Sequence, residues 1–244
     1  TTNERNDLQI DALMRLFYDP NISSQNSSHQ LSEEESKHIS RVLRMNEGAV
    51  IGVLNGLGSL FECKIVKSHP KHCELFILEE KKAKKPAYEI HIAIGPTKQM
   101  DRLEWFIEKA TEIGITEISL IQCKNSERIK IKSERLRRKA ISAMKQSHRL
   151  YLPKINELMP VTDFIKSNTD GLIAHCYENE RSHLSDVYRA NNCPILIGPE
   201  GDFSEDEIEI ALENDYKTIT LGENRLRTET AALFACMNAK LLIG

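Results

Sequence analysis

Two segments near the C-terminus share one pattern, a short aliphatic or β-branched run that ends at glycine. Residues 194–197 (PILI) are stopped by Gly198, and residues 217–221 (KTITL) are stopped by Gly222. Runs of this kind are typical of strands, and glycine is typical of the turns that end them. We therefore expect two strands, each followed directly by a tight loop.

A helix start follows each of these loops. Ser204 precedes three acidic residues, and Thr228 precedes Glu229 and an alanine-rich run. Ser and Thr are favoured N-caps, and carboxylates stabilise the positive end of the helix dipole. The two strand–loop–helix units predict that backbone N–H groups and polar side chains meet at the carboxyl ends of neighbouring strands. Open α/β sheets bind their ligands there.

The rest of the chain divides into a β-rich part and an alternating part. The β-rich part has a capping-box pattern that opens a helix at 32–44, followed by expected strands at 49–55, 59–67 and 73–78. In the alternating part we expect strands at 88–94, 115–121 and 172–176, with helices around the apolar stripe of 103–113 and at 133–149. Trp105 lies beside that stripe, so we expect it at the edge of the core or at a subunit interface. Alternation of this kind predicts an α/β sheet with mostly parallel strands.

The two C-terminal segments also carry a family resemblance. Residues 198–204 (GPEGDFS) and 221–231 (LGENRLRTETA) resemble the two C-terminal signatures of the RsmE family, the bacterial 16S rRNA uridine-N3 methyltransferases. Further segments match this family in order and spacing, namely residues 14–18 (MRLFY), 38–45 (HISRVLRM), 98–114 (KQMDRLEWFIEKATEIG) and 146–149 (QSHR). The resemblance extends over residues 14–244, and this many motifs in register make it specific.

The resemblance implies an α/β fold in which a small β-rich PUA-like domain precedes a knotted methyltransferase domain of the SPOUT (trefoil-knot) superfamily. It implies methyl transfer from S-adenosyl-L-methionine (AdoMet) to N3 of a uridine in 16S rRNA, either free or within the small ribosomal subunit, by a homodimer that contributes to ribosome biogenesis. Without the resemblance, the alternation alone favours an unknotted, Rossmann-like sheet, because threaded chains are rare.

The implied domain boundaries follow from the same match. We expect a PUA-like RNA-binding domain at 14–80, a linker at 81–87 and the SPOUT domain at 88–244. The run of lysines and the proline at 81–86 favour a solvated tether over a direct RNA contact, because like charges repel and proline breaks regular structure. Residues 1–13 are polar and precede the methionine that matches the family's start, so we expect an added or disordered segment there.

The sequence departs from the family pattern at three positions. Asp202 stands where the family usually has a second glycine, so a backbone position with positive φ would hold an aspartate, which tolerates that conformation better than most residues. Asn224 and Arg225 replace an arginine and an aliphatic residue. A role for the first of those family residues is therefore not expected here, whereas Arg227 matches directly.

The signatures nominate a cofactor site and a catalytic group. The implied AdoMet-binding residues are His175, Ile197, Gly198, Pro199, Gly201, Leu221, Gly222, Leu226, Thr230 and Ala231. For catalysis, Arg227 could stabilise the negative charge that develops on uracil, and Glu200 or Glu229 could accept the N3 proton. A purely structural alternative is that Glu229 complements the helix dipole while Arg227 pairs with it.

A basic segment points to RNA despite a net charge of −3. Residues 124–149 carry ten Lys and Arg against two Glu, and this asymmetry indicates a phosphate-binding surface. The alternative is a solvated helix face. The expected RNA contacts are Arg128, Arg137, Arg138 and Arg149, together with Arg15, Arg41 and Arg44 of the N-terminal part.

Composition narrows the classes of protein to which the chain can belong. No apolar run approaches the ~20 residues of a membrane span and no signal peptide opens the chain, so we expect a soluble, cytoplasmic protein without membrane partners. The six cysteines form no Cys-x-x-Cys pair, which favours free thiols and no structural metal. Three functions stay open from the residues themselves: uracil-N3 methylation, methylation of a ribose 2′-OH or another base, and a non-catalytic RNA-binding assembly module. A P-loop NTPase is excluded, because its motif is absent.

Overall fold

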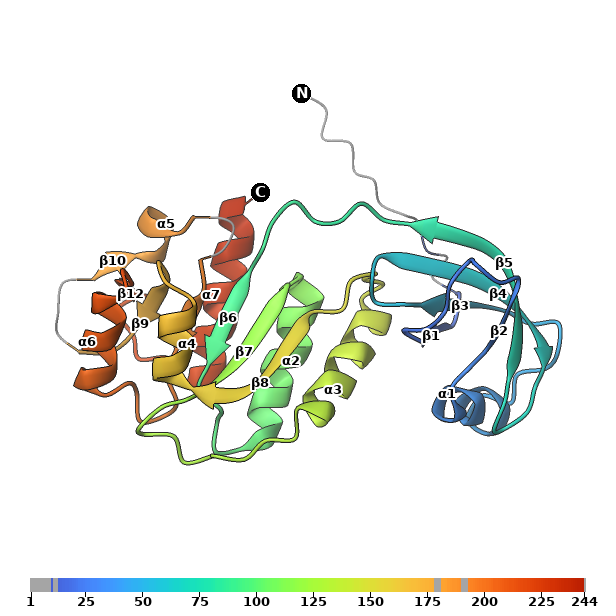
Figure 1. Ribbon diagram of the computed structural model, residues 1–244, viewed down its shortest axis with the longest axis horizontal. Coiled ribbons are helices and arrows are strands. Elements are labelled where there is room, and N and C mark those ends of the chain that lie inside the picture. The colour runs from blue at the N-terminus through green and yellow to red at the C-terminus, as the bar shows by residue number, and fades with distance from the viewer. Residues whose placement is uncertain (1–9, 11–12, 178–180, 190–192, 244) are drawn as a thin grey trace, which may run out of the picture. The chain divides into compact units, whose positions relative to one another are not determined.

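The computed structural model describes residues 10, 13–177, 181–189 and 193–243, so the expectation for residues 1–13 falls largely outside the described part. The chain divides into two compact units (Figure 1). The first unit comprises residues 1–85 and 144–152, and the second comprises residues 86–143 and 153–244.

The first unit is built on a five-stranded sheet with the order β1-β3-β4-β5-β2. The strands are β1 (Leu16–Tyr18), β2 (Ser28–Gln30), β3 (Val50–Leu54), β4 (Ser59–Lys67) and β5 (Glu74–Lys82). Only the β1–β3 pair is parallel. Cys63 and Leu75 are fully buried between more exposed neighbours, as period-two patterning requires, whereas β3 is buried from Ile51 to Leu54.

The expected helix at 32–44 is shorter than predicted and changes its winding. The α-helix α1 (Glu33–Lys37) continues as the π-helical turn η1 (His38–Val42). Ser32 caps α1 through the backbone N–H of Glu35, but only this half of the capping box forms. The Glu35 carboxylate accepts the backbone N–H of Tyr18 instead, at 3.1 Å. This bond ties the helix start to strand β1.

The stretch expected to open the linker is partly a strand. Lys81 and Lys82 belong to β5 and pair in register with β4. Each ammonium group is paired with a carboxylate, which reduces the repulsion between the two lysines. Lys81 Nζ lies 3.4 Å from a Glu62 carboxylate oxygen, and Lys82 Nζ lies 3.3 Å from one of Glu80. The prediction of a tether from residue 81 assumed that these like charges repel each other. Acidic side chains on the sheet offset that repulsion, so the strand continues to Lys82.

Residues 144–152 complete the first unit. Met144 and Leu150 pack with Leu54 and Leu60 in a small apolar cluster. The Lys145 ammonium lies 3.0 Å from the buried Glu35 carboxylate. The preceding helix α3 (Ser133–Gln146) ends three residues before residue 149, where the expected helix ended. Residues on both sides of this end make the contacts within the first unit.

The second unit is a seven-stranded, all-parallel sheet with the order β10-β12-β9-β11-β6-β7-β8. Its strands are β6 (His91–Ile94), β7 (Glu117–Gln122), β8 (Lys154–Pro160), β9 (Leu172–Ala174), β10 (Ser182–His183), β11 (Ile195–Ile197) and β12 (Lys217–Thr220). The predicted α/β sheet of parallel strands is therefore confirmed. Sequence patterning did not indicate β8 or β10, and β6 begins three residues later than expected.

Helices cover both faces of this sheet (Figure 1). One group contains α4 (Val161–Ser167) and α6 (Glu205–Glu213), which pack with sheet residues such as Leu196 in an apolar cluster centred on Phe164 and Phe203. The other contains α2 (Met100–Ile113), α5 (Leu184–Val187) and α7 (Thr228–Ile243). Helix α7 contacts both β6 and β11.

Strand order sets where a ligand can bind. From the interior strand β6 the chain runs outward through β7 and β8, and then returns to the other side of β6 with β9, β11 and β12. Loops diverge at such a reversal, so a crevice forms beyond the carboxyl ends of the strands. No helix in the described part of the chain is long and apolar enough to cross a membrane.

Candidate functional site

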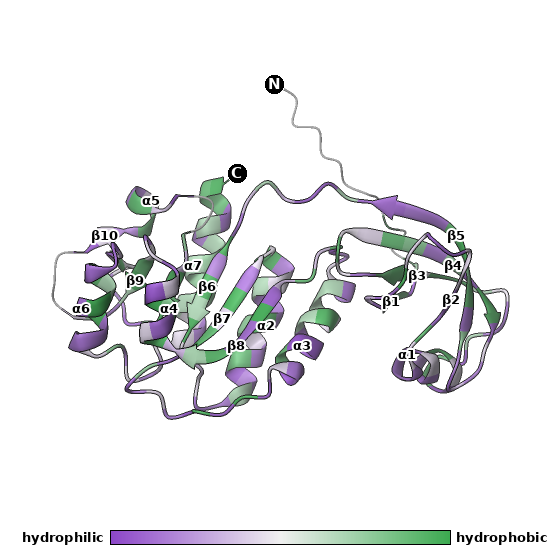
Figure 2. Cartoon of the chain, viewed as in Figure 1, coloured by the Kyte–Doolittle hydropathy of each residue, from purple (hydrophilic) through white to green (hydrophobic). Residues whose placement is uncertain are grey.

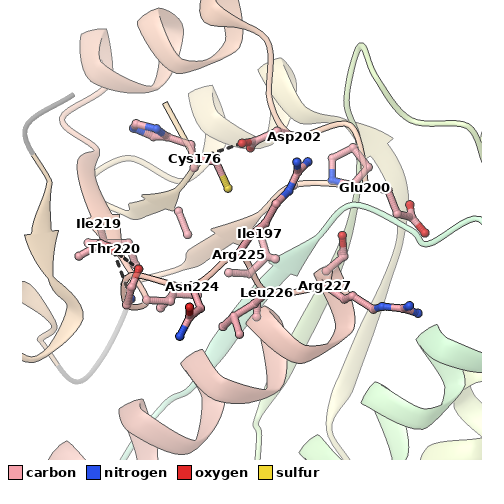
Figure 3. A pocket seen from close by; sticks show the side chains of 18 of the residues that line it. Cys176, Ile197, Glu200, Asp202, Ile219, Thr220, Asn224, Arg225, Leu226 and Arg227 are labelled. Carbon is pink, nitrogen blue, oxygen red and sulfur yellow. Dashed lines mark hydrogen bonds between the residues drawn. The ribbon is translucent and has the colours of Figure 1, made fainter. Parts of the chain in front are cut away.

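A cavity of about 400 Å³ opens beyond the carboxyl ends of β9, β11 and β12 (Figure 3). Its walls come from the ends of these strands, the loops that follow them and the first turn of α7. Of the residues predicted to bind a cofactor or to act in catalysis, those that line it are His175, Ile197, Gly198, Pro199, Glu200, Leu221, Gly222, Leu226, Arg227 and Ala231. The two signature segments, although more than ten residues apart in sequence, thus meet at one site.

Asp202 holds the loop after β11 in place. Its backbone has φ of 61°, as expected at this departure from the family pattern. Its carboxylate accepts the backbone N–H of Cys176 and that of Phe203, each at 2.8 Å. The first of these bonds, drawn in Figure 3, joins the loop after β9 to the loop after β11. A glycine could adopt the same φ but could not form either bond.

Gly201 does not line the cavity. A Cβ atom on this residue would come within 2.8 Å of Asn125 Cβ. The Asn125 amide donates to the carbonyl oxygens of Gly201 and Asp202, at 3.0 and 3.2 Å. The close approach that requires glycine here is therefore to the loop after β7, and not to a ligand as the sequence suggested. Thr230 also lies outside the cavity lining.

The turn after β12 needs glycine for its conformation. Gly222 has φ of 122°, a region that side chains rarely adopt, although a Cβ there would meet nothing within 4 Å. The Thr220 hydroxyl secures the turn, because it donates to the Gly222 carbonyl at 3.0 Å and accepts its N–H at 3.2 Å. Both polar backbone groups of Gly222 are thus bonded within the turn, and the residue lines the cavity without a side chain.

His175 brings an unpartnered polar group to the cavity wall. It is only 5% exposed, and neither ring nitrogen has a hydrogen-bond partner among the described residues. Burial lowers the pKa of the imidazole, with Asp202 opposing the shift and Arg181 adding to it. The ring is therefore neutral at neutral pH, with one nitrogen able to donate and the other able to accept.

The predicted catalytic residues separate into two positions. Glu200 and Arg227 line the cavity, and Figure 3 draws them toward one side of it, away from Thr220 and Asn224. Glu229 is only 7% exposed and is not part of the lining. Glu200 already accepts the backbone N–H of Lys98, at 3.0 Å.

The alternative considered from the sequence, a structural pairing of Arg227 with Glu229, does not form. The cation that faces Glu229 is Arg102, whose Nε lies 3.8 Å from Glu229 Oε1. Arg227 forms no ion pair with a carboxylate among the described residues. Arg102 itself lines the cavity, and sequence reasoning did not single it out. A signal existed, since a cation in the first turn of a helix opposes the helix dipole.

Two of the predicted RNA contacts of the first unit lie at one shallow depression. Arg41 and Arg44 line it together with polar groups such as Ser68, and Arg44 has φ of 50°. Arg15 is exposed on the same unit, and Arg149, in the segment 144–152, is half-buried.

The basic segment of the second unit is less free than its sequence suggests. The Arg128 guanidinium donates to the carbonyl oxygens of Thr97, at 3.1 Å, and Lys98, so it holds a loop. Arg138 pairs with Glu134 on α3 at 3.5 Å. Arg137 is exposed and has no ion pair with a described residue. Among the arginines predicted to contact RNA from this unit, Arg137 is therefore the freest to meet a phosphate.

Comparisons with known proteins agree on the family. A model described as "RNA methyltransferase domain" matches residues 83–240, and one described as "RNA methyltransferase PUA domain" matches residues 31–78. Ribosomal RNA small subunit methyltransferase E of Rickettsia conorii is 30% identical over 226 residues, which cover 90% of this chain and 92% of the relative.

Solved structures match over nearly the whole chain. A probable rRNA-methyltransferase from Porphyromonas gingivalis is 42% identical with a TM-score of 0.83, covering 94% of this chain and 98% of that one. Ribosomal RNA small subunit methyltransferase E from Neisseria gonorrhoeae, bound to S-adenosyl methionine, shares the fold with a TM-score of 0.83 at 24% identity, covering 94% and 98%. The chain belongs to the ribosomal RNA small subunit methyltransferase E family.

Proposed function

We propose that the protein transfers a methyl group from AdoMet to N3 of a uridine in 16S rRNA. The observation that carries the proposal is the convergence of both signature segments on one cavity at the carboxyl edge of a parallel sheet. Family membership supports an RNA of the small ribosomal subunit as the substrate. Such a substrate also implies that the protein works in the cytoplasm, where ribosomes are assembled.

The cavity suits AdoMet in size and in chemistry. Its volume of about 400 Å³ falls in the ~300–1,000 Å³ range of small-molecule sites. Aliphatic walls from Ile197, Leu221 and Leu226 can hold the adenine, and the absence of a side chain at Gly222 leaves room for it to approach the backbone closely. His175 contributes to the wall, with both of its ring nitrogens buried. AdoMet, when bound, supplies a methyl group activated on a sulfonium.

Arg227 is the proposed charge stabiliser. As the N3–methyl bond forms and the sulfonium–methyl bond breaks, the sulfur keeps the electron pair and the N3 proton leaves. Negative charge builds on the uracil oxygens while that proton is removed, and a guanidinium at the cavity wall stabilises it. Between the two candidate carboxylates, Glu200 is the better proton acceptor, directly or through water, because it lines the cavity.

A homodimer is the second part of the proposal. Phe234, Met237 and Leu241 recur at helical spacing along α7 and are 43%, 46% and 77% exposed. Trp105, on the neighbouring helix α2, is also 43% exposed. The last turn of α7 is hydrophobic as well (Figure 2). Single apolar side chains on a surface are ordinary, but a contiguous apolar stripe marks an interaction site. A second copy of the chain would bury this stripe.

The function is tested by nucleoside mass spectrometry of small-subunit RNA treated with purified protein and AdoMet. We expect one new N3-methyluridine per RNA. In the variant Ala231→Leu, a larger side chain fills the cavity from α7, so AdoMet affinity measured by calorimetry should fall at least ~10-fold and product should disappear.

Ala231→Ser is the matched control and should keep both properties. A methylated ribose or a different methylated base in the wild-type reaction would refute the proposed acceptor. Full AdoMet affinity in Ala231→Leu would refute the proposed cofactor site.

Arg227→Ala should slow methyl transfer without weakening binding. Because the guanidinium is needed most in the transition state, we expect a single-turnover rate ~10²–10³-fold lower at saturating AdoMet and RNA. Arg227→Lys should recover part of the rate, since a point charge does not reproduce the planar fork. A normal rate in Arg227→Ala would remove this residue from the mechanism, and loss of AdoMet binding would make its role structural.

Arg137→Ala should flatten the salt dependence of RNA binding. Loss of one phosphate contact lowers the slope of log affinity against log salt by ~0.7–0.9. Arg138→Ala should change the slope less, because Glu134 already pairs with Arg138. Lys166→Ala, an exposed cation on α4 outside the basic segment, is the control and should leave the slope unchanged. An unchanged slope in Arg137→Ala would show a solvated helix face.

A further inference from the structure

We propose that Arg102 is a second catalytic arginine that contacts the acceptor uracil beside Arg227, and that Glu229 is the positioning residue that holds Arg102 in place. The inference rests on the proposed methyl transfer to uracil N3. It assigns a role to a residue outside both signature segments, and it changes the role expected of Glu229 from proton acceptor to support.

Burial separates the two members of the Arg102–Glu229 pair. Arg102 lines the cavity and its side chain is 31% exposed, whereas the Glu229 side chain is 9% exposed and lies behind the lining. Glu229 Oε2 has no hydrogen-bond partner among the described residues, and Oε1 faces Arg102 Nε at 3.8 Å. A buried carboxylate with one free oxygen is costly unless a cation stays near it. Glu229 therefore restrains Arg102, while it has no access of its own to the cavity.

The backbone that carries Arg102 is also held in place. Glu200 accepts the backbone N–H of Lys98 at 3.0 Å, and Arg128 donates to the Thr97 carbonyl at 3.1 Å. These bonds tie the loop that leads into α2 to the loop after β11, through Glu200, and to the segment after β7, through Arg128. A cation in the first turn of α2 works against the helix dipole. Its presence at a cavity wall is better explained by a ligand than by helix stability.

The chemistry of uracil calls for two cations. N3 lies between the two carbonyl carbons of the ring, so the charge left by the departing N3 proton spreads over both O2 and O4. Two guanidinium groups at one cavity, Arg102 and Arg227, can stabilise one oxygen each. Such a pair also selects the base. Cytosine carries an amino donor in place of O4, and a guanidinium that has only donors would face it without an acceptor.

The test is a double-mutant cycle on single-turnover methylation at saturating AdoMet and RNA. Arg102→Ala should lower the rate ~10²–10³-fold with unchanged AdoMet affinity by calorimetry. Glu229→Gln should lower it less, because the amide loosens Arg102 without removing it. If Glu229 acts only through Arg102, the double variant should be no slower than Arg102→Ala alone.

Two further variants keep the test decisive. Arg102→Lys retains a cation opposite Glu229, so it should fold, bind AdoMet and show an intermediate rate. Lys109→Ala removes a cation from the same helix that pairs with Glu108 and Glu112 outside the cavity, and it should react at the wild-type rate. A readout independent of turnover is the Arg102 Nε–H resonance, which should shift in Glu229→Gln and stay in place in Lys109→Ala.

The outcomes separate cleanly. A normal rate in Arg102→Ala, or in Arg102→Lys where Arg102→Ala does not fold, overturns the catalytic role. Multiplicative losses in the double variant give Glu229 a function of its own and overturn its positioning role. A wild-type protein that binds AdoMet but methylates no uracil refutes the proposed function and this inference with it. A wild-type protein that methylates N3 while Arg102→Ala matches it refutes this inference alone.

Discussion

Three carboxylates in one stretch of the chain hold the site together. Residues 200–207 follow β11, and each carboxylate accepts a backbone N–H from the loop after a different strand of the same sheet. The bonds are Glu200 to Lys98 after β6, Asp202 to Cys176 after β9 and Glu207 to Lys124 after β7, at 3.0, 2.8 and 2.7 Å. Charge-assisted bonds of this kind are stronger than neutral ones. The loops at the carboxyl edge therefore form one assembly before any ligand binds.

This assembly has consequences for catalysis. Methyl transfer gains most from groups that are already aligned, because alignment removes entropy from the barrier. Asp202 fixes the wall that carries His175, and Glu200 fixes the loop that leads to Arg102. The segment 200–207 thus positions cavity-lining side chains that belong to other parts of the chain. A change at residue 200 or 202 is expected to alter geometry as well as charge.

Local patterning predicted the parts of the fold whose signals are local. Ser204 is the N-cap of α6, with a complete capping box through Glu207, and Asp202 adopts the positive φ expected of it. Nothing local indicated that residues 144–152 pack in the first unit, because those contacts join positions nearly a hundred residues apart. The Arg102–Glu229 pair was not predicted either, because its two residues lie far apart in the sequence. The knot was implied by the family resemblance alone, since the alternation of strands and helices by itself favours an unthreaded sheet.

The most direct test of the central claim is amide hydrogen exchange of the ligand-free protein at the three tied positions. If the carboxylates of residues 200–207 preassemble the cavity, the amides of Lys98, Lys124 and Cys176 should exchange slowly, although they lie in loops. Exchange at the rate of an open loop, with protection appearing only when AdoMet is added, would contradict the account. It would mean that the ligand, and not the protein, assembles the site.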